Sequence, residues 1–206
     1  MLLPGAATSL SVSPDSGSVI VAGRDMLRLV SVNENHLADV LNLLTHTRKS
    51  SNLSSNNVKW RPQHASQLAT GATTGAILIW DTAKRGDSLV RTLSGHSRAV
   101  NSLSFLEREP NLLLSASQDK TVRLWDVGQR LTTQQLCFTM AAEVRDVQFS
   151  SRSQMRFAVA LENGTMQVYD MRSNKEVAIM PCTATSAPPY ARTSICAHAH
   201  WPRRLC

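Results

Sequence analysis

The chain has 206 residues, of which 42% are hydrophobic and 18% are charged, and its formal charge is +7. This size and composition exclude a wholly disordered chain and a small disulfide-stapled fold. No apolar run approaches the roughly 18 residues that a membrane span needs, and the N-terminus lacks the pattern of a signal peptide. We therefore expect a cytoplasmic protein without membrane insertion.

The positive charge is a weak argument for binding to nucleic acid. Three of the 22 basic residues, Arg192, Arg203 and Arg204, follow residue 182, where no acidic residue occurs, and the rest of the chain carries only +4. Elsewhere the two signs are interspersed and aromatic residues make up 5%, whereas nucleic-acid domains usually carry a basic stripe with stacking aromatics. No nucleic-acid partner is expected, and a basic nucleic-acid-associated module stays open as an alternative.

The chain contains an internal repeat of about 44 residues. One series of anchor residues, spaced 48, 45 and 44 apart, is Val12, Trp60, Phe105 and Phe149. A second series, spaced 50, 45 and 44 apart, is Val30, Trp80, Trp125 and Tyr169. The two anchors of a repeat lie 20 residues apart in the last three repeats and 18 in the first.

Each repeat divides into short runs that are typical of strands. The third repeat has such runs at 100–105, 112–117 and 121–125, a turn at 118–120, and a fourth run at 131–138. The nearest approach to a helical pattern is at 36–44, where the flanking repeats favour a strand.

Four strands per repeat are typical of a β-propeller blade. We therefore predict an all-β fold, a partial propeller of about four blades with an irregular or disordered C-terminal tail. The predicted blades are 5–44, 53–90, 95–138 and 139–182, and the tail is 183–206.

The third repeat resembles the Gly-His to Trp-Asp signature of the WD-repeat (WD40) family. The matching residues are Gly95-His96, Ser115, Asp119 and Trp125-Asp126, and Trp80-Asp81 and Tyr169-Asp170 are similar endings in the neighbouring repeats. The resemblance implies a structural hydrogen-bond lock made of His96, Ser115, Asp119 and Trp125.

The neighbouring repeats depart from this signature. Ser51 and Met140 stand at the positions equivalent to His96, and Thr74 and Asn163 at those equivalent to Asp119. We therefore expect these blades to be held by packing alone.

Six further strings resemble, in order and spacing, the N-terminal propeller of a family of GATOR/SEA-complex subunits. The strings are 21–24, 41–43, 48–53, 68–75, 144–150 and 162–164. The resemblance implies a non-enzymatic interaction scaffold that positively regulates target-of-rapamycin signalling in response to amino acids. It also implies other protein subunits as partners and an indirect association with the lysosomal or vacuolar surface.

The resemblance ends near residue 180, where the family would continue into further blades. Pro188-Pro189 obstructs a following strand, and the composition changes after Cys182, so we expect a truncated chain. A WD-repeat adaptor in an unrelated assembly, such as ubiquitin ligation or vesicle traffic, is the alternative.

The partner-binding rim is predicted from the repeat. Asn56, Asn101 and Arg145 stand four residues before their anchors, and Arg98 lies just before the innermost strand of the third repeat. Binding residues concentrate on loops held by a rigid scaffold, so we predict that these four residues contact partners. Ordinary exposed polar surface is the alternative for each of them.

No catalytic residue, metal site or cofactor is predicted. The Ser, His and Asp of the third repeat lack the second glycine of a nucleophile elbow, and no glycine-rich phosphate loop occurs. Cys182, Cys196, His198, His200 and Cys206 could supply soft ligands, but nothing around them would fix four ligands for zinc.

Overall fold

The computed structural model describes residues 5–33, 36–46, 54–84, 87–129, 134–153, 155–173 and 175–181. These residues form four sheets of four antiparallel strands, so the predicted all-β class is confirmed. Within the same ranges, none of the helical segments has the length and apolar character needed to cross a membrane. The predicted tail at 183–206 and Ser51 lie outside the described residues.

Chain order and spatial order agree within every sheet. The first sheet consists of β1 (Ala7–Val12), β2 (Ser18–Gly23), β3 (Met26–Asn33) and β4 (His36–Asn42), after which a 3-10 turn, η1 (Leu43–His46), follows. The second consists of β5 (Ser55–Trp60), β6 (Gln67–Ala72), β7 (Ile77–Asp81) and β8 (Leu89–Leu93). The third consists of β9 (Val100–Phe105), β10 (Leu112–Ser117), β11 (Thr121–Asp126) and β12 (Gln134–Thr139). The fourth consists of β13 (Val144–Phe149), β14 (Arg156–Leu161), β15 (Thr165–Asp170) and β16 (Lys175–Pro181).

The constant anchor spacing has a direct structural cause. In the third sheet Phe105 pairs with Leu113, and Leu113 pairs with Trp125 on its other side. Cross-strand partners share one face of a sheet, so the two anchors lie on the same face with one residue between them. The corresponding register holds in the other three sheets. The 20 residues from one anchor to the other therefore comprise the turn after the innermost strand, the second strand, the turn after it, and the third strand up to the paired position.

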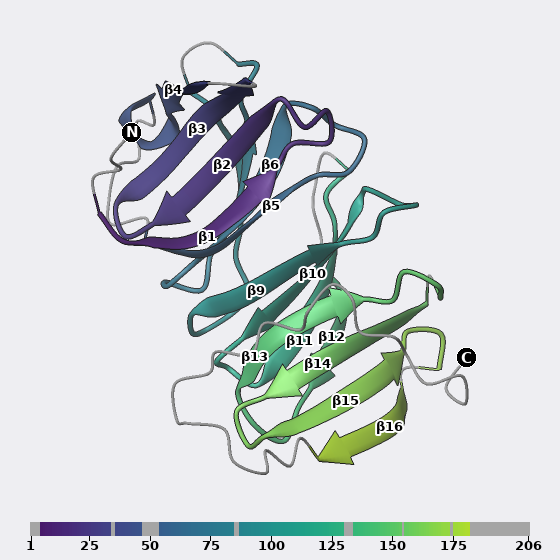
Figure 1. Cartoon of the computed structure of the whole chain (residues 1–206). Coiled ribbons are helices and arrows are strands. Elements are labelled where there is room, and N and C mark those ends of the chain that lie inside the picture. Colours follow the sequence, from purple (N-terminus) through teal and green to yellow (C-terminus); the bar gives the residue numbers. More distant parts are fainter. Residues whose placement is uncertain are drawn as a thin grey trace.

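Successive sheets pack face to face along an arc, with the innermost strands β1, β5, β9 and β13 in contact (Figure 1). We call the face of a sheet that packs on the next sheet in the chain its forward face, and the opposite face its backward face. Ile77 and Ile79 on the forward face of the second sheet, for example, join Leu103, Phe105 and Trp125 on the backward face of the third in one buried cluster. Two similar clusters fill the junctions before and after it.

The turn between the second and third strands of each sheet needs a left-handed residue. Asp25, Gly75, Lys120 and Gly164 all have positive φ there, and the last three are spaced 45 and 44 apart. At Gly75 a Cβ would lie 2.6 Å from the His96 carbonyl oxygen, whereas at Gly164 it would meet nothing within 4 Å. Gly75 therefore serves both the turn and the close approach of the second sheet to the third.

These two glycines give a matched test of the junction. Gly164→Ala is expected to lower the free energy of unfolding by about 1 to 2 kcal/mol, because a residue with a Cβ is strained at positive φ. Gly75→Ala adds the clash with His96 and should cost about 1 to 3 kcal/mol more. Urea unfolding followed by circular dichroism measures both, and equal losses would contradict the close approach.

Candidate functional site

A series of hydrogen bonds connects the loop before β9 to the strands of the third sheet. His96 Nε2 lies 2.7 Å from Ser115 Oγ, and His96 Nδ1 lies 2.9 Å from Asp119 Oδ2. Trp125 donates from Nε1 to the same Ser115 oxygen at 2.8 Å. The structure thus brings together all four residues that the WD-repeat resemblance indicates.

The direction of these bonds follows from the donors present. The ionised Asp119 carboxylate can only accept, so His96 Nδ1 donates to it, and in a neutral ring Nε2 then accepts from the Ser115 hydroxyl, whose oxygen accepts from Trp125. This arrangement requires a neutral imidazole. Burial, together with the charge of Arg123, lowers the pKa of His96 although Asp119 acts to raise it, which agrees with a neutral ring.

Asp119 is the one charged member of the series. Burial acts to raise its pKa, but hydrogen bonds from Thr121, His96 and the Ser97 amide outweigh burial and lower the pKa to about 2. Thr121 donates from its hydroxyl at 2.6 Å and from its backbone amide at 3.0 Å. Thr121 was not predicted from the sequence, although a hydroxyl residue two positions after the turn carboxylate is a signal for it.

The series has the distances of a Ser-His-Asp triad but no route to a substrate. Ser115 is 0% exposed, and its hydroxyl oxygen already accepts a hydrogen bond from Trp125. A nucleophile must reach the reacting carbonyl, so this geometry fits a structural role.

The neighbouring sheets keep different parts of the series. In the second sheet Trp80 donates from Nε1 to Thr70 Oγ1 at 3.0 Å, so the expectation that packing alone holds this sheet is wrong. Thr70 stands 45 residues before Ser115, which is the signal that could have found it. In the fourth sheet the same position is the buried Val159, and among the residues that the structure describes Asn163 accepts only from Thr165.

Two of the predicted rim residues join neighbouring sheets. Asn101 Nδ2 donates to the Val144 carbonyl at 2.8 Å, and Asn56 Nδ2 donates to the Val100 carbonyl at 3.2 Å. Each asparagine is the extra residue of a β-bulge in the innermost strand. These bonds could not be predicted from the sequence, because a bulge breaks the alternation from which side-chain direction is inferred.

The other two rim residues, Arg98 and Arg145, are exposed and ion-paired. Arg98 Nη1 lies 2.9 Å from Glu143 Oε1, and Arg145 Nη2 lies 3.4 Å from Glu143 Oε2. Arg145 also pairs with Glu162, and this hydrogen bond raises the pKa of Arg145 and lowers that of Glu162. The repeat does not indicate the two glutamates, because Ala99 and Gln118, which stand 44 residues before them, are not acidic.

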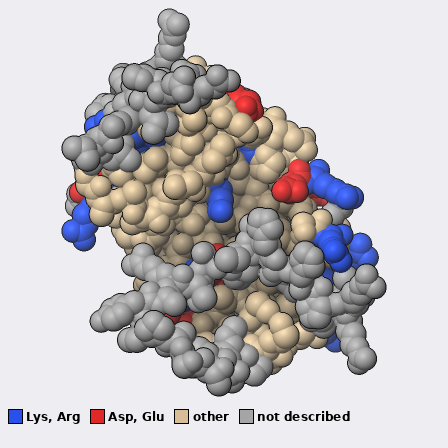
Figure 2. Space-filling view, in the orientation of Figure 1, with Lys and Arg blue, Asp and Glu red and all other residues tan. Residues whose placement is uncertain are grey.

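The resulting rim is a row of alternating charges that crosses the junction of the third and fourth sheets. It runs through Arg98, Glu143, Arg145 and Glu162, and its formal charges cancel. Figure 2 shows the same mixture on one face of the molecule, where charged side chains are scattered over a largely uncharged surface. A scattered charge of both signs suits recognition of a protein surface better than binding of a polyanion.

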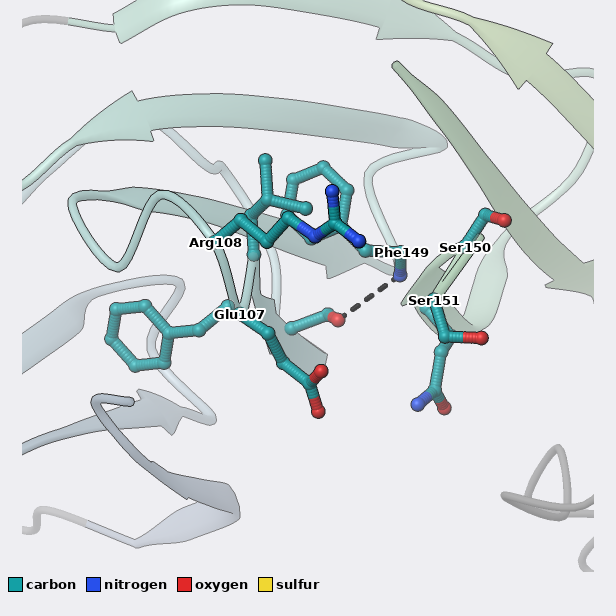
Figure 3. Close-up of a pocket in the computed structure, with 9 residues that line it drawn as sticks. Glu107, Arg108, Phe149, Ser150 and Ser151 are labelled. Atoms are coloured by element: carbon teal, nitrogen blue, oxygen red, sulfur yellow. Dashed lines mark hydrogen bonds between the residues drawn. The ribbon is translucent and has the colours of Figure 1, made fainter. Parts of the chain in front are cut away.

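A small cleft of about 100 Å³ lies at the other ends of β9 and β13, lined by residues 104–108 and 148–151 (Figure 3). The backbone amide of Phe149 donates to Ser104 Oγ at 3.1 Å across it, and Glu107 and Arg108 lie beside it. Among the described residues the buried polar atom without a partner is Asn57 Oδ1, which does not line this cleft. The cleft therefore holds no orphaned group that would indicate a ligand.

The described part of the chain contains no group of three or more His, Cys, Asp or Glu side chains that could hold a metal ion. Cys137 is an exposed free thiol. Cys182, Cys196, His198, His200 and Cys206, which were considered for zinc, lie outside the described ranges.

Comparisons with known proteins agree with this geometry. Residues 87–126, which include the whole hydrogen-bonded series, match the family model "WD domain, G-beta repeat". The chain is 36% identical over 172 residues to GATOR2 complex protein WDR24 of Xenopus laevis and 34% identical to the human protein of that name, in each case over 82% of this chain and 22% of the relative. It is 32% identical over 184 residues to Restriction of telomere capping protein 1 of Candida albicans, over 80% of this chain and 17% of the relative. The chain thus spans about a fifth of the length of these curated relatives.

The hydrogen-bonded series predicts a stability difference between two equivalent turns. Asp119→Ala should lower the free energy of unfolding by about 1 to 3 kcal/mol at pH 7, because it leaves buried donors unpaired. Asn163→Ala should cost less, since Asn163 has no histidine partner. The folded-state pKa of Asp119 is depressed, so its contribution is present at neutral pH and disappears as the pH falls from about 4 toward 2.

Urea titrations at several pH values check both statements. Equal losses at the two turns, or a difference between wild type and Asp119→Ala that does not shrink in acid, would contradict the arrangement.

The asparagine bridges predict a different pattern. Asn101→Asp replaces an amide donor by a carboxylate that faces the Val144 carbonyl, so it should destabilise the junction by about 1 to 3 kcal/mol. The matched change Asn111→Asp, at an asparagine that accepts from Arg61, keeps its acceptor and should cost little. Thermal unfolding of both variants decides, and a larger loss for Asn111→Asp would contradict the bridge.

Proposed function

Because the chain belongs to the WD-repeat family, we propose that it acts as a non-enzymatic scaffold, as a subunit or part of a subunit of a GATOR/SEA-type complex. In this proposal it promotes target-of-rapamycin signalling when amino acids are sufficient. Its partners are other protein subunits, and it is a cytoplasmic protein that reaches the lysosomal or vacuolar surface only through them.

One observation carries the proposal. The similarity to proteins named GATOR2 complex protein extends over 82% of the chain at 34 to 36% identity, well beyond the single matched WD repeat. A likeness confined to 40 residues would indicate only the repeat. An extended likeness suggests that surfaces outside the repeat signature are shared as well, which is why a specific assembly is proposed.

The structure supports a scaffold through its rigidity. Buried clusters fill the junctions between sheets, and side chains such as Asn56 and Asn101 bind backbone across them. Loops on such a frame are held in fixed relative positions. The scaffold therefore loses little conformational freedom when a partner binds several of them.

The proposed partner-binding rim comprises Asn56, Arg98, Asn101 and Arg145, with unequal roles. Arg98 and Arg145 are exposed, with side chains 62% and 43% accessible, and would contact the partner directly. The asparagines are partly buried and would hold the rim in place. Glu143 fixes both guanidinium groups, so each arginine keeps further N–H donors for a partner carboxylate or carbonyl.

The experiment is capture of the tagged chain from cells that contain the GATOR/SEA complex, followed by mass spectrometry. We expect the complex subunits to be enriched. Arg98→Glu combined with Arg145→Glu should reduce their recovery at least about tenfold, which corresponds to 1.4 kcal/mol of binding. Arg24→Glu combined with Arg172→Glu changes the charge equally at exposed positions of the first and fourth sheets and should leave recovery unchanged.

The contrary results are also defined. Enrichment of ubiquitin-ligase or vesicle-traffic proteins in place of these subunits would overturn the proposed assembly while leaving a scaffold role. Equal recovery with the two double variants would overturn the rim. Circular dichroism of both variants verifies that the sheets are intact.

A further inference from the structure

The backward face of the first sheet is apolar; it is exposed along β1, whereas Val21 and Val30 farther into the sheet are 9% and 6% exposed. Leu10 and Val12 on β1 are 63% and 51% exposed, and Val32 on β3 is 37% exposed. By register, Leu10 and Val12 share a face with Val21 and Val19 of β2. The opposite face of this sheet packs on the second sheet through Ile20, Ala22 and Leu27, among others. The first sheet is therefore built to bury both faces.

The junctions inside the molecule show how a backward face is covered. At each junction the innermost strand of the later sheet offers, at its first residue, a backbone carbonyl to the bulge residue of the sheet before it. Three such bonds occur: Thr8 Oγ1 to the Ser55 carbonyl at 2.6 Å, Asn56 to Val100, and Asn101 to Val144. The same bond therefore recurs at every junction of the described chain.

At two of the three junctions a second bond occurs five residues further along the innermost strand of the later sheet. The Trp60 amide donates to Ser11 Oγ at 3.0 Å, and the Phe149 amide donates to Ser104 Oγ at 3.1 Å. A covering strand thus carries a donor side chain at its bulge at all three junctions, and an acceptor side chain three residues later at two of them; at the junction of the second and third sheets Lys59 holds that position.

On the first sheet the equivalent positions are the Ala7 carbonyl and the Val12 amide. Ala7 stands 48 residues before Ser55, and Val12 stands 48 before Trp60. A covering strand would thus bind β1 by the pattern that the internal junctions use.

The innermost strand of the fourth sheet carries that pattern. Its bulge residue is Arg145, a donor, and three residues later stands Gln148, whose side-chain oxygen is an acceptor. Both residues are exposed. They stand 44 residues after Asn101 and Ser104, which hold these two roles at the preceding junction.

Side-chain volumes on the two faces also match. The second, third and fourth sheets carry aromatic anchors on their backward faces, whereas the first has Val12 and Val30. A covering face must therefore be bulkier than the internal forward faces. The forward face of the fourth sheet has the long side chains of Met166 and Met180 at cross-strand positions, both partly exposed.

We propose that the forward face of the fourth sheet of one copy docks on the backward face of the first sheet of a second copy. Arg145 then donates to the Ala7 carbonyl and Gln148 accepts from the Val12 amide of the other copy. The contact joins two different faces, so two copies use it twice when they close into a ring of eight sheets.

Size-exclusion chromatography with light scattering on the purified full chain tests the proposal. The expected mass is twice the 22.6 kDa of the chain. Leu10→Asp with Val12→Asp blocks the backward face and should raise the dissociation constant at least about a hundredfold, since two apolar side chains lose their burial. Gln148→Arg with Met180→Arg blocks the forward face and should do the same.

Mixing the two blocked variants distinguishes this contact from a symmetric one. Each variant keeps one intact face, so the mixture should recover a dimer that neither variant forms alone. Val177→Asp with Ile179→Asp is the matched control, because these exposed apolar residues of β16 lie outside the proposed contact, and it should stay dimeric.

Three outcomes would overturn the proposal: a monomeric wild type, a mixture that stays monomeric, or a control that dissociates. Far-ultraviolet circular dichroism on each variant verifies the strand content, so loss of the dimer is not mistaken for loss of the fold.

Discussion

The packing of one sheet's backward face on the forward face of the sheet before it is the interaction on which the rest of the structure depends. The two anchors of a sheet lie on its backward face with one residue between them, as Phe105, Leu113 and Trp125 do. They are large apolar side chains, each of which contributes about 1.5 to 3 kcal/mol when it is fully buried. A small residue on the facing sheet lets the sheets approach closely, as Gly71 of the second sheet does against Val100 of the third. The repeat in the sequence is therefore the repeat of a packing interface.

The polar groups serve this packing. The hydrogen bonds of His96, Ser115, Asp119 and Trp125 hold a loop on the third sheet, and the same loop receives the Gly75 turn of the second sheet. The asparagine bridges act at the inner edge of this junction, through Asn56, and of the next one, through Asn101. The same loops carry the charged rim. Arg98 lies on the loop before β9 and Glu143 on the loop before β13, and the two side chains pair across the junction. Stability and the proposed binding surface thus depend on one set of contacts.

Much of the fold could be predicted from the sequence because its signal is carried by large residues at constant spacing. The strands of the third sheet were predicted almost to the residue, whereas its outermost strand was predicted at 131–138 and lies at Gln134–Thr139. Outermost strands have one partner and exposed positions, so their apolar pattern is weaker.

The candidate site was predictable only in part. The WD signature indicated His96, Ser115, Asp119 and Trp125, because the resemblance names residues in a fixed relation. The signature did not indicate Thr70, which takes the place of the signature serine in the second sheet. Nor did it indicate the glutamates that pair with Arg98 and Arg145, because these are not part of the signature. The asparagine bridges depend on bulges, and a bulge leaves no trace in side-chain alternation.

The most direct test of sheet-on-sheet packing is a double-mutant cycle between Gly71 and Val100. A Cβ at position 71 would lie 2.7 Å from Val100 Cγ1, so Gly71→Ala should destabilise the protein by a clash that Val100→Ala partly removes. The account predicts that the double variant is more stable than the sum of the single losses by about 1 kcal/mol or more, measured by urea unfolding. Losses that add within about 0.5 kcal/mol would show that the second and third sheets do not meet as described.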